Sequence, residues 1–211
     1  MTRSPAVVVV DYGSGNLRSA ERALAKVGAE VTVSSEVAAA ADADGVVVPG
    51  VGAFAACMAG VQAVGADELV RSRVAAGRPV LGICVGMQVL YASGEEHGVE
   101  TAGIGVLPGH VQRLRAPVLP HMGWNGVQPA DGSALFAGVE QERFYFVHSY
   151  AVLPSQPSGG DGTGLAETLT THGEQFVAAV EAGVVAGTQF HPEKSGDAGL
   201  AVLRNWVKSL S

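Results

Sequence analysis

The chain has 211 residues, of which 47% are hydrophobic and 16% are charged, and its formal net charge is −7. This composition is typical of a globular protein with a sizeable core, and it excludes a disordered or fibrous chain. Because the charge is acidic and no basic block is present, we expect no nucleic-acid partner.

The first half of the chain alternates strand-like and helix-like segments. Valine-rich apolar runs predict parallel strands covered on both faces, at Ala6–Val10, 30–33, 45–48 and 79–83. Apolar residues at helical spacing predict helices at 16–27, 53–64 and 67–76. This βαβα order predicts an α/β fold with an open, mostly parallel, doubly wound sheet of the flavodoxin-like type.

The second half changes character. Short strand candidates joined by glycine- or proline-bearing turns predict an antiparallel extension of the sheet, at 106–114, 143–153, 165–170, 175–180 and 184–189. Residues 154–164 are rich in Ser, Gly and Pro and predict a surface loop. An amphipathic helix is expected at 199–210. With no repeat and no clear boundary, we expect a single domain spanning 1–211.

No segment is expected to enter a membrane. The uncharged stretch 45–65 is long enough to cross one, but Pro49 and several glycines divide it into a strand, a loop and a helix. The apolar run Ala6–Val10 is too short for the core of a signal peptide. Two cysteines are too few for a disulfide scaffold, so we expect a cytoplasmic chain.

A Gly-Ile-Cys-Val-Gly sequence at 82–86 follows the strand expected at 79–83 and precedes a helix expected to begin at 87–91. Such an elbow lifts its central side chain, here Cys84, out of the sheet, and the flanking glycines permit the turn. A thiol at a helix N-terminus favours thiolate, and the N–H of Val85 is available to an oxyanion. A lone cysteine in an apolar run is more often core filler, but the spaced glycines favour a nucleophile.

His191-Pro192-Glu193 follows the strand expected at 184–189. Proline favours an extended residue before it, and residues two apart on an extended chain face the same side. Glu193 would therefore orient the imidazole of His191 as a base for the Cys84 thiol, the arrangement used in covalent acyl transfer. A loop histidine beside a solvated glutamate is the alternative when the pair is considered alone.

Two glycine-bearing loops follow strands. The Pro-Gly-Val-Gly sequence at 49–52 could offer backbone N–H groups to an oxyanion, although an ordinary strand-to-helix turn is a serious alternative. Gly13-Ser14-Gly15 does not predict dinucleotide binding, because Arg18 occupies the third glycine position and 34–35 lacks an acidic residue.

No cofactor and no metal ion are expected. Five histidines are dispersed along the chain without ligand spacing, and we expect surface or supporting roles for them: His97, His110, His121, His148 and His172. Cys57 is expected to be dispensable for turnover.

Together these motifs resemble the class I (triad) glutamine amidotransferases and, among them, the glutaminase subunits of imidazole glycerol phosphate synthases. The narrower resemblance rests on Pro-Gly-Val-Gly at 49–52 and on three further stretches, and it runs essentially from end to end. These stretches are Asp-Tyr-Gly-Ser-Gly-Asn at 11–16, Pro-His-Met-Gly-Trp-Asn at 120–125 and Phe-Tyr-Phe-Val-His-Ser-Tyr at 144–150.

The resemblance implies that Cys84 attacks the carboxamide of L-glutamine. His191, oriented by Glu193, would protonate the departing ammonia and then activate water. The N–H of Val85 and one from Val51 or Gly52 would hold the oxyanion, the second after a backbone rearrangement. Residues that would hold glutamine are Gln88, Glu96, Ser149 and Tyr150.

The resemblance also implies a heterodimer with a cyclase subunit built on a (β/α)8 barrel. The cyclase would combine the ammonia with a ribulosyl phosphate, giving imidazole glycerol phosphate and aminoimidazole carboxamide ribotide in histidine biosynthesis, so that the complex acts as hydrolase and lyase. Expected interface residues are Asn16, Met122, Trp124, Asn125 and Lys194. Another class I glutaminase or cysteine hydrolase, and a catalytically silent partner-binding scaffold, are the alternatives.

Overall fold

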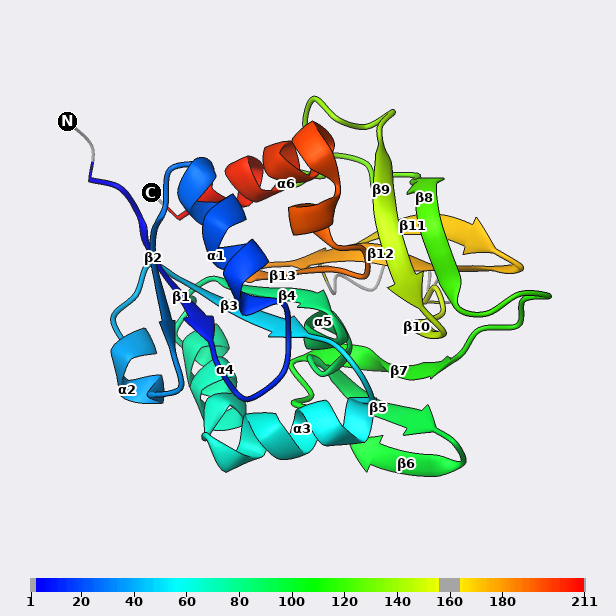
Figure 1. Ribbon diagram of the computed structural model, residues 1–211, viewed down its shortest axis with the longest axis horizontal. Coiled ribbons are helices and arrows are strands. Elements are labelled where there is room, and N and C mark those ends of the chain that lie inside the picture. Colours follow the sequence, from blue (N-terminus) through cyan, green and yellow to red (C-terminus); the bar gives the residue numbers. More distant parts are fainter. Residues whose placement is uncertain (1–2, 156–163, 211) are drawn as a thin grey trace.

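A central seven-stranded sheet organises the computed structural model, which describes residues 3–155 and 164–210 (Figure 1). Its strands follow the order β11 (Leu165–His172), β12 (Glu174–Ala182), β13 (Val185–Thr188), β4 (Val80–Cys84), β3 (Gly45–Gly50), β1 (Ala6–Val10) and β2 (Glu30–Ser34). From β13 to β2 every neighbouring pair is parallel, whereas β11, β12 and β13 pair antiparallel. The mostly parallel sheet with an antiparallel extension is therefore confirmed.

Helices cover both faces of this sheet. On one face α1 (Leu17–Lys26) packs beside α6 (Gly196–Lys208), and on the other α3 (Phe54–Ala63) precedes α4 (Ala66–Ala75) (Figure 1). A short helix, α2 (Val37–Ala40), follows β2. The valines of β1 and β3 are buried between the two helical layers, as expected for strands covered on both faces.

Residues 91–152 also build two smaller sheets beside the central one (Figure 1). The four-stranded sheet has the order β10 (Tyr150–Val152), β7 (Leu107–Arg113), β5 (Tyr91–Glu96) and β6 (Val99–Ala102). The two-stranded sheet pairs β8 (His121–Gly126) with β9 (Arg143–His148). The single strand expected at 143–153 is thus two strands in different sheets, and β5, β6 and β8 were not expected.

The prediction of a helix over residues 87–91 was wrong in its extent, because the helix is shorter and ends earlier. Helix α5 (Val85–Gln88) has four residues, and the chain enters β5 at Tyr91. The carbonyl of Val89 accepts the N–H of Ile104 at 2.7 Å, and the carbonyl of Leu90 accepts two further N–H groups from 106 and 107. Backbone groups that a longer helix would pair internally are therefore paired with a distant segment.

Two further expectations were a surface loop at 154–164 and the absence of a membrane-spanning segment. Of the loop expected at 154–164, residues 156–163 lie outside the described residues. Within the described ranges, no helix has both the length and the apolar character required to cross a membrane.

Candidate active site

Cys84 is the last residue of β4 and immediately precedes α5. Its backbone adopts φ 57° and ψ −116°, a conformation that L-residues rarely adopt. Its side chain is buried, with 3% exposed. Strained residues of this kind persist only where the surrounding packing enforces them, and they concentrate at functional sites.

The glycines around Cys84 serve close packing rather than the turn itself, because the positive φ belongs to the cysteine. A Cβ at Gly86 would lie 1.8 Å from the carbonyl oxygen of Val48 in β3. A Cβ at Gly50 would lie 2.5 Å from the amide nitrogen of Gly86. Only glycine allows β3 and the start of α5 to approach this closely, and this contact holds Cys84 in place.

His191 and Glu193 form a buried pair beyond the end of β13. His191 Nδ1 lies 2.8 Å from Glu193 Oε1, and the two side chains are 2% and 3% exposed. The chain is extended at His191 but then enters the 3₁₀ turn η1 (Pro192–Lys194), so the pair meets through a tight turn rather than along an extended strand. The hydroxyl of Ser195 donates to the His191 carbonyl at 2.7 Å and fixes this turn.

The electrostatics of His191 favour its protonated form. Burial lowers the pKa of His191, but its electrostatic interactions with Cys84 and Glu193 outweigh the effect of burial and raise the pKa to about 9. With Nδ1 held by Glu193, Nε2 has no hydrogen-bond partner within the described chain. The imidazole can therefore carry a proton on Nε2 in the pocket that it shares with Cys84.

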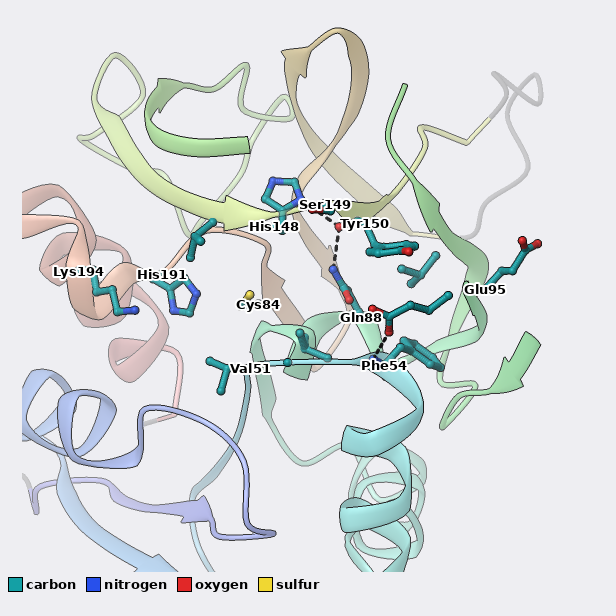
Figure 2. A pocket seen from close by; sticks show the side chains of 15 residues that line it. Val51, Phe54, Cys84, Gln88, Glu95, His148, Ser149, Tyr150, His191 and Lys194 are labelled. Atoms are coloured by element: carbon teal, nitrogen blue, oxygen red, sulfur yellow. Dashed lines mark hydrogen bonds between the residues drawn. The ribbon is translucent and has the colours of Figure 1, made fainter. Parts of the chain in front are cut away.

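A cavity of about 220 Å³ opens above Cys84. Figure 2 shows His191 and Gln88 on opposite sides of the sulfur. The lining includes most of the catalytic, oxyanion and substrate candidates, namely Cys84, His191, Val51, Gly52, Val85, Gln88, Glu96, Ser149 and Tyr150. Glu193 contacts Nδ1 of His191 and is not part of the lining.

Gln88 and Glu96 are already held in place by the protein. The amide nitrogen of Gln88 donates to the Tyr150 carbonyl and to Gln189 Oε1, both at 2.9 Å, which leaves its carbonyl oxygen for a ligand (Figure 2). Glu96 Oε2 accepts the N–H of Phe54 at 2.8 Å. The second oxygen of Glu96 can accept a hydrogen bond from an ammonium group in the cavity.

The backbone N–H groups of two expected oxyanion residues, Val85 and Val51, differ in their hydrogen bonding. Val85 begins α5 directly after Cys84, and its N–H is not used by the first helical turn. The N–H of Val51, in contrast, donates to the hydroxyl of Ser14 at 3.2 Å. A donor that is engaged in this way is not available to an oxyanion at Cys84.

Comparison with known proteins agrees with this geometry. A family model described as glutamine amidotransferase class-I matches residues 8–210. The chain is 62% identical over 205 residues to the imidazole glycerol phosphate synthase subunit HisH of Mycobacterium tuberculosis (strain ATCC 25618 / H37Rv), covering 97% of this chain and 98% of that protein. The chain belongs to the HisH family of class I glutamine amidotransferases.

Other relatives and solved structures agree. The HisH subunit of Thermobifida fusca (strain YX) is 57% identical over 209 residues, covering 98% of this chain and 99% of the relative. A crystal structure of a glutamine amidotransferase matches with a TM-score of 0.74 at 20% identity, covering 97% of each chain. A putative GMP synthase protein from Thermoplasma acidophilum matches with a TM-score of 0.72 at 18% identity, covering 100% of this chain and 96% of that one. At these identities the two structures support the fold alone.

The interface residues expected in this amidotransferase lie mainly on β8. Met122 and Trp124 alternate onto the solvent side of the strand, where they are 62% and 48% exposed. Asn125 faces the other way and donates to the Thr171 carbonyl at 3.0 Å. Asn16 is the N-cap residue of α1, and Lys194 is exposed at the edge of the cavity.

Sequence reasoning missed Gln189 as a residue of the glutamine amidotransferase site. It is fully buried, and its Nε2 lies 3.8 Å from the sulfur of Cys84, within reach of a weak hydrogen bond. Its carbonyl oxygen accepts from Gln88. The signal in the sequence was the position of Gln189 directly before Phe190 and His191. That stretch was analysed only for the catalytic roles of its histidine and its glutamate.

Three histidines that are dispersed in sequence meet in the fold. His121 Nδ1 lies 3.1 Å from His148 Nε2, and the His121 ring stacks on His172 with centroids 4.3 Å apart. Because His148 Nδ1 donates to the Tyr150 carbonyl, its Nε2 must accept, and His121 donates to it. Burial lowers the pKa of His121 to about 4 and that of His148 to about 3. Across 3–155 and 164–210, no three His, Cys, Asp or Glu side chains are arranged as a metal site.

Proposed function

We propose that the chain is the glutaminase subunit of an imidazole glycerol phosphate synthase. It hydrolyses L-glutamine to glutamate and ammonia and delivers the ammonia to a cyclase subunit in histidine biosynthesis. The observation that carries the proposal is the Cys84–His191–Glu193 arrangement at a cavity of about 220 Å³, in a chain 62% identical to a HisH subunit.

The first half-reaction forms a thioester. The Cys84 thiolate attacks the side-chain carbonyl carbon of glutamine, and the electron pair of the C=O bond moves onto oxygen, where the N–H of Val85 stabilises it. When the tetrahedral intermediate collapses, the carbon–nitrogen bond breaks. His191 transfers its Nε2 proton to the nitrogen, which leaves as ammonia, and a neutral imidazole remains.

The second half-reaction restores the enzyme. Neutral His191 removes a proton from water as the water oxygen attacks the thioester carbon. The carbon–sulfur bond then breaks, the electron pair returns to Cys84 as thiolate, and glutamate leaves. Glu193 holds the imidazole in the same tautomer and stabilises its charged form through both steps.

Substrate orientation is assigned to the pocket wall opposite His191. Glu96 binds the α-ammonium of glutamine by a charge-assisted hydrogen bond, and Gln88, Ser149 and Tyr150 line the remaining wall. The cavity needs no cofactor for this chemistry, because nucleophile, base and oxyanion donor all come from the chain.

The proposed partner is a cyclase subunit with a (β/α)8 barrel, which docks on the face that carries Met122 and Trp124. A large exposed aromatic ring is the kind of side chain that anchors an interface. Asn16, Asn125 and Lys194 are assigned to the same interface. The proposal further treats residues 1–211 as one catalytic domain acting in the cytoplasm, consistent with two free cysteines among the described residues.

The test is glutamate release from glutamine by the chain alone and with the cyclase subunit plus a ribulosyl phosphate ligand. Strong stimulation by the liganded partner, lost in Cys84→Ala, supports the proposal. Activity that ignores the partner indicates a different class I glutaminase or cysteine hydrolase. No activity in either state indicates a scaffold without catalysis.

A further inference from the structure

A series of buried hydrogen bonds ends at the sulfur of Cys84. The Tyr150 carbonyl accepts the Gln88 amide nitrogen at 2.9 Å, and the same nitrogen donates to Gln189 Oε1 at 2.9 Å. Gln189 Nε2 in turn lies 3.8 Å from Cys84 Sγ. Cys84 and Gln88 are each 3% exposed and Gln189 is fully buried, so these bonds are shielded from bulk water and electrostatically strengthened.

One backbone carbonyl determines the direction of every bond in this series. A carbonyl oxygen only accepts, so the Gln88 side chain must turn its nitrogen, and not its oxygen, towards Tyr150. His148 Nδ1, at 2.9 Å, donates to the same carbonyl and helps to hold it in place. The Gln88 nitrogen only donates, so the Gln189 atom beside it must be the amide oxygen. The amide nitrogen of Gln189 is therefore directed at the sulfur of Cys84.

We propose that Gln189 is a further catalytic residue, whose amide N–H stabilises negative charge on the sulfur of Cys84. Gln88 is the positioning residue that keeps this donor turned towards the sulfur. The inference rests on the proposed glutaminase function, because it assigns a partner to the nucleophile of that reaction. Hydrogen bonds to charged acceptors are shorter and stronger than those to neutral ones, so the contact of 3.8 Å should contract when the thiol ionises.

His191 cannot supply this stabilisation throughout the reaction. It gives its Nε2 proton to the departing ammonia and takes a proton from water in the second half-reaction, so its proton serves the substrate in both steps. The carboxamide of Gln189 exchanges no proton. Its N–H remains at the sulfur while the thiolate awaits substrate, and again when the carbon–sulfur bond breaks and the electron pair returns to sulfur.

Alkylation of Cys84 by iodoacetamide tests the contact without glutamine. The thiolate is the reactive form, so the pH profile of the alkylation rate reports how readily the sulfur carries charge. Gln189→Met keeps a long unbranched side chain but has no N–H donor. Its profile should lie about one pH unit above that of the wild type. The rate at the high-pH plateau should not fall, because a thiolate that lacks the bond is more nucleophilic, whereas a distorted site would lower it.

Two matched variants separate the donor from its surroundings. Gln88→Met removes the bond that orients Gln189 and should give a smaller shift in the same direction, because the amide can then also turn its oxygen to the sulfur. Thr188→Val removes a buried hydroxyl that donates to the Phe190 carbonyl at 3.0 Å, next to Gln189 in the chain, and should give the wild-type profile. Mass spectrometry of the Cys84 peptide gives the alkylation rate, and thermal denaturation confirms that each variant is folded.

Glutamine turnover provides a second readout, in which kcat of Gln189→Met should fall about tenfold with and without the cyclase partner. A folded Gln189→Met chain with the wild-type alkylation profile would overturn the role of Gln189 and leave the proposed function intact. An equal shift in Thr188→Val would also overturn that role, because loss of any nearby buried bond would then move the profile. A wild-type chain without glutaminase activity, in which Gln189→Met still shifts the profile, would overturn the proposed function alone.

Discussion

The two halves of the catalytic pocket are built to different degrees of completion. On the nucleophile side, the side chains of Cys84, His191 and Glu193 are buried and are held by glycine packing and a hydrogen-bonded turn. On the oxyanion side, Val51 is 42% exposed and its N–H is bound to Ser14. The nucleophile and the Val51 backbone are thus held by different segments of the chain and to different degrees. The difference teaches that one backbone segment of the pocket can change its hydrogen bonds without disturbing the nucleophile.

Removal of the nucleophile should have the largest effect on glutamate release. Cys84→Ala should lower glutamate release by about 10⁴-fold or more in both the isolated and the stimulated chain. Cys84→Gly should be equally inactive but more stable than Cys84→Ala by about 1 kcal/mol, because glycine adopts φ 57° without strain. Denaturant unfolding measures this second effect. Residual turnover in a folded Cys84→Ala chain would reject Cys84 as the nucleophile.

Glu193→Gln should reduce activity less than Cys84→Ala does. Losing the carboxylate that orients His191 should reduce kcat by about 10³-fold, with partner binding retained. The pKa of His191 is about 9 in the folded chain and 6.5 in the unfolded chain. Its contribution to the free energy of unfolding is therefore full below pH 6.5 and is lost as the pH rises through 9. Glu193→Gln should flatten this decline, as measured by unfolding at pH 6, 8 and 10. A variant with wild-type kcat and an unchanged pH profile would contradict the orienting role.

The buried histidines connect the exposed face of β8 with the pocket and predict an acid response. His121 and His148 have folded-state pKa values of about 4 and 3, below the unfolded 6.5, so their contribution is full above pH 6.5 and is lost as pH falls through 4. Each of the two histidines should lower the free energy of unfolding by about 3 kcal/mol over this interval. His121→Asn keeps a donor near Nδ1 and should reduce the slope. Identical slopes in the wild type and the variant would exclude this origin.

The partner face should give the smallest effects. Trp124→Ala should weaken binding of the cyclase subunit by about 2 kcal/mol, roughly thirtyfold in Kd, and Lys194→Ala by less than about 1 kcal/mol. Val99→Ala, at an exposed valine on β6, is the matched control and should leave Kd unchanged. Titration calorimetry with the basal glutaminase rate as a second readout separates docking from catalysis. Wild-type Kd values for both variants would remove these residues from the interface.

The sequence predicted the elements whose patterns are local. Valine runs and helical spacing gave β1, β3, β4 and the helices around them, and the three catalytic candidates came from two short motifs. β5 and β8 were missed because they are rich in polar residues and glycine, and they exist through pairing with β7 and β9. Such strands are stabilised by tertiary pairing rather than by intrinsic propensity.

The site residues that were missed depend on contacts between distant parts of the chain. Ser14 meets Val51 across 37 residues, and Gln189 meets Cys84 across 105. No periodicity or spacing in the sequence predicts which peptide group a hydroxyl will bond. The histidines were likewise judged by their spacing in sequence, whereas the antiparallel pairing of β8 with β9 places His121 directly opposite His148.

The inward-pointing histidines also offer a spectroscopic use. His121 and His148 each carry one Nδ1 proton, donated within the protein and largely removed from bulk water. Imidazole protons of this kind exchange slowly and resonate far downfield, apart from the amide region of an NMR spectrum. The molecule therefore contains a natural, label-free probe that extends from His121 on β8 to His148 in the lining of the pocket at Cys84. Its chemical shifts would report docking at one end and glutamine at the other, in the same sample.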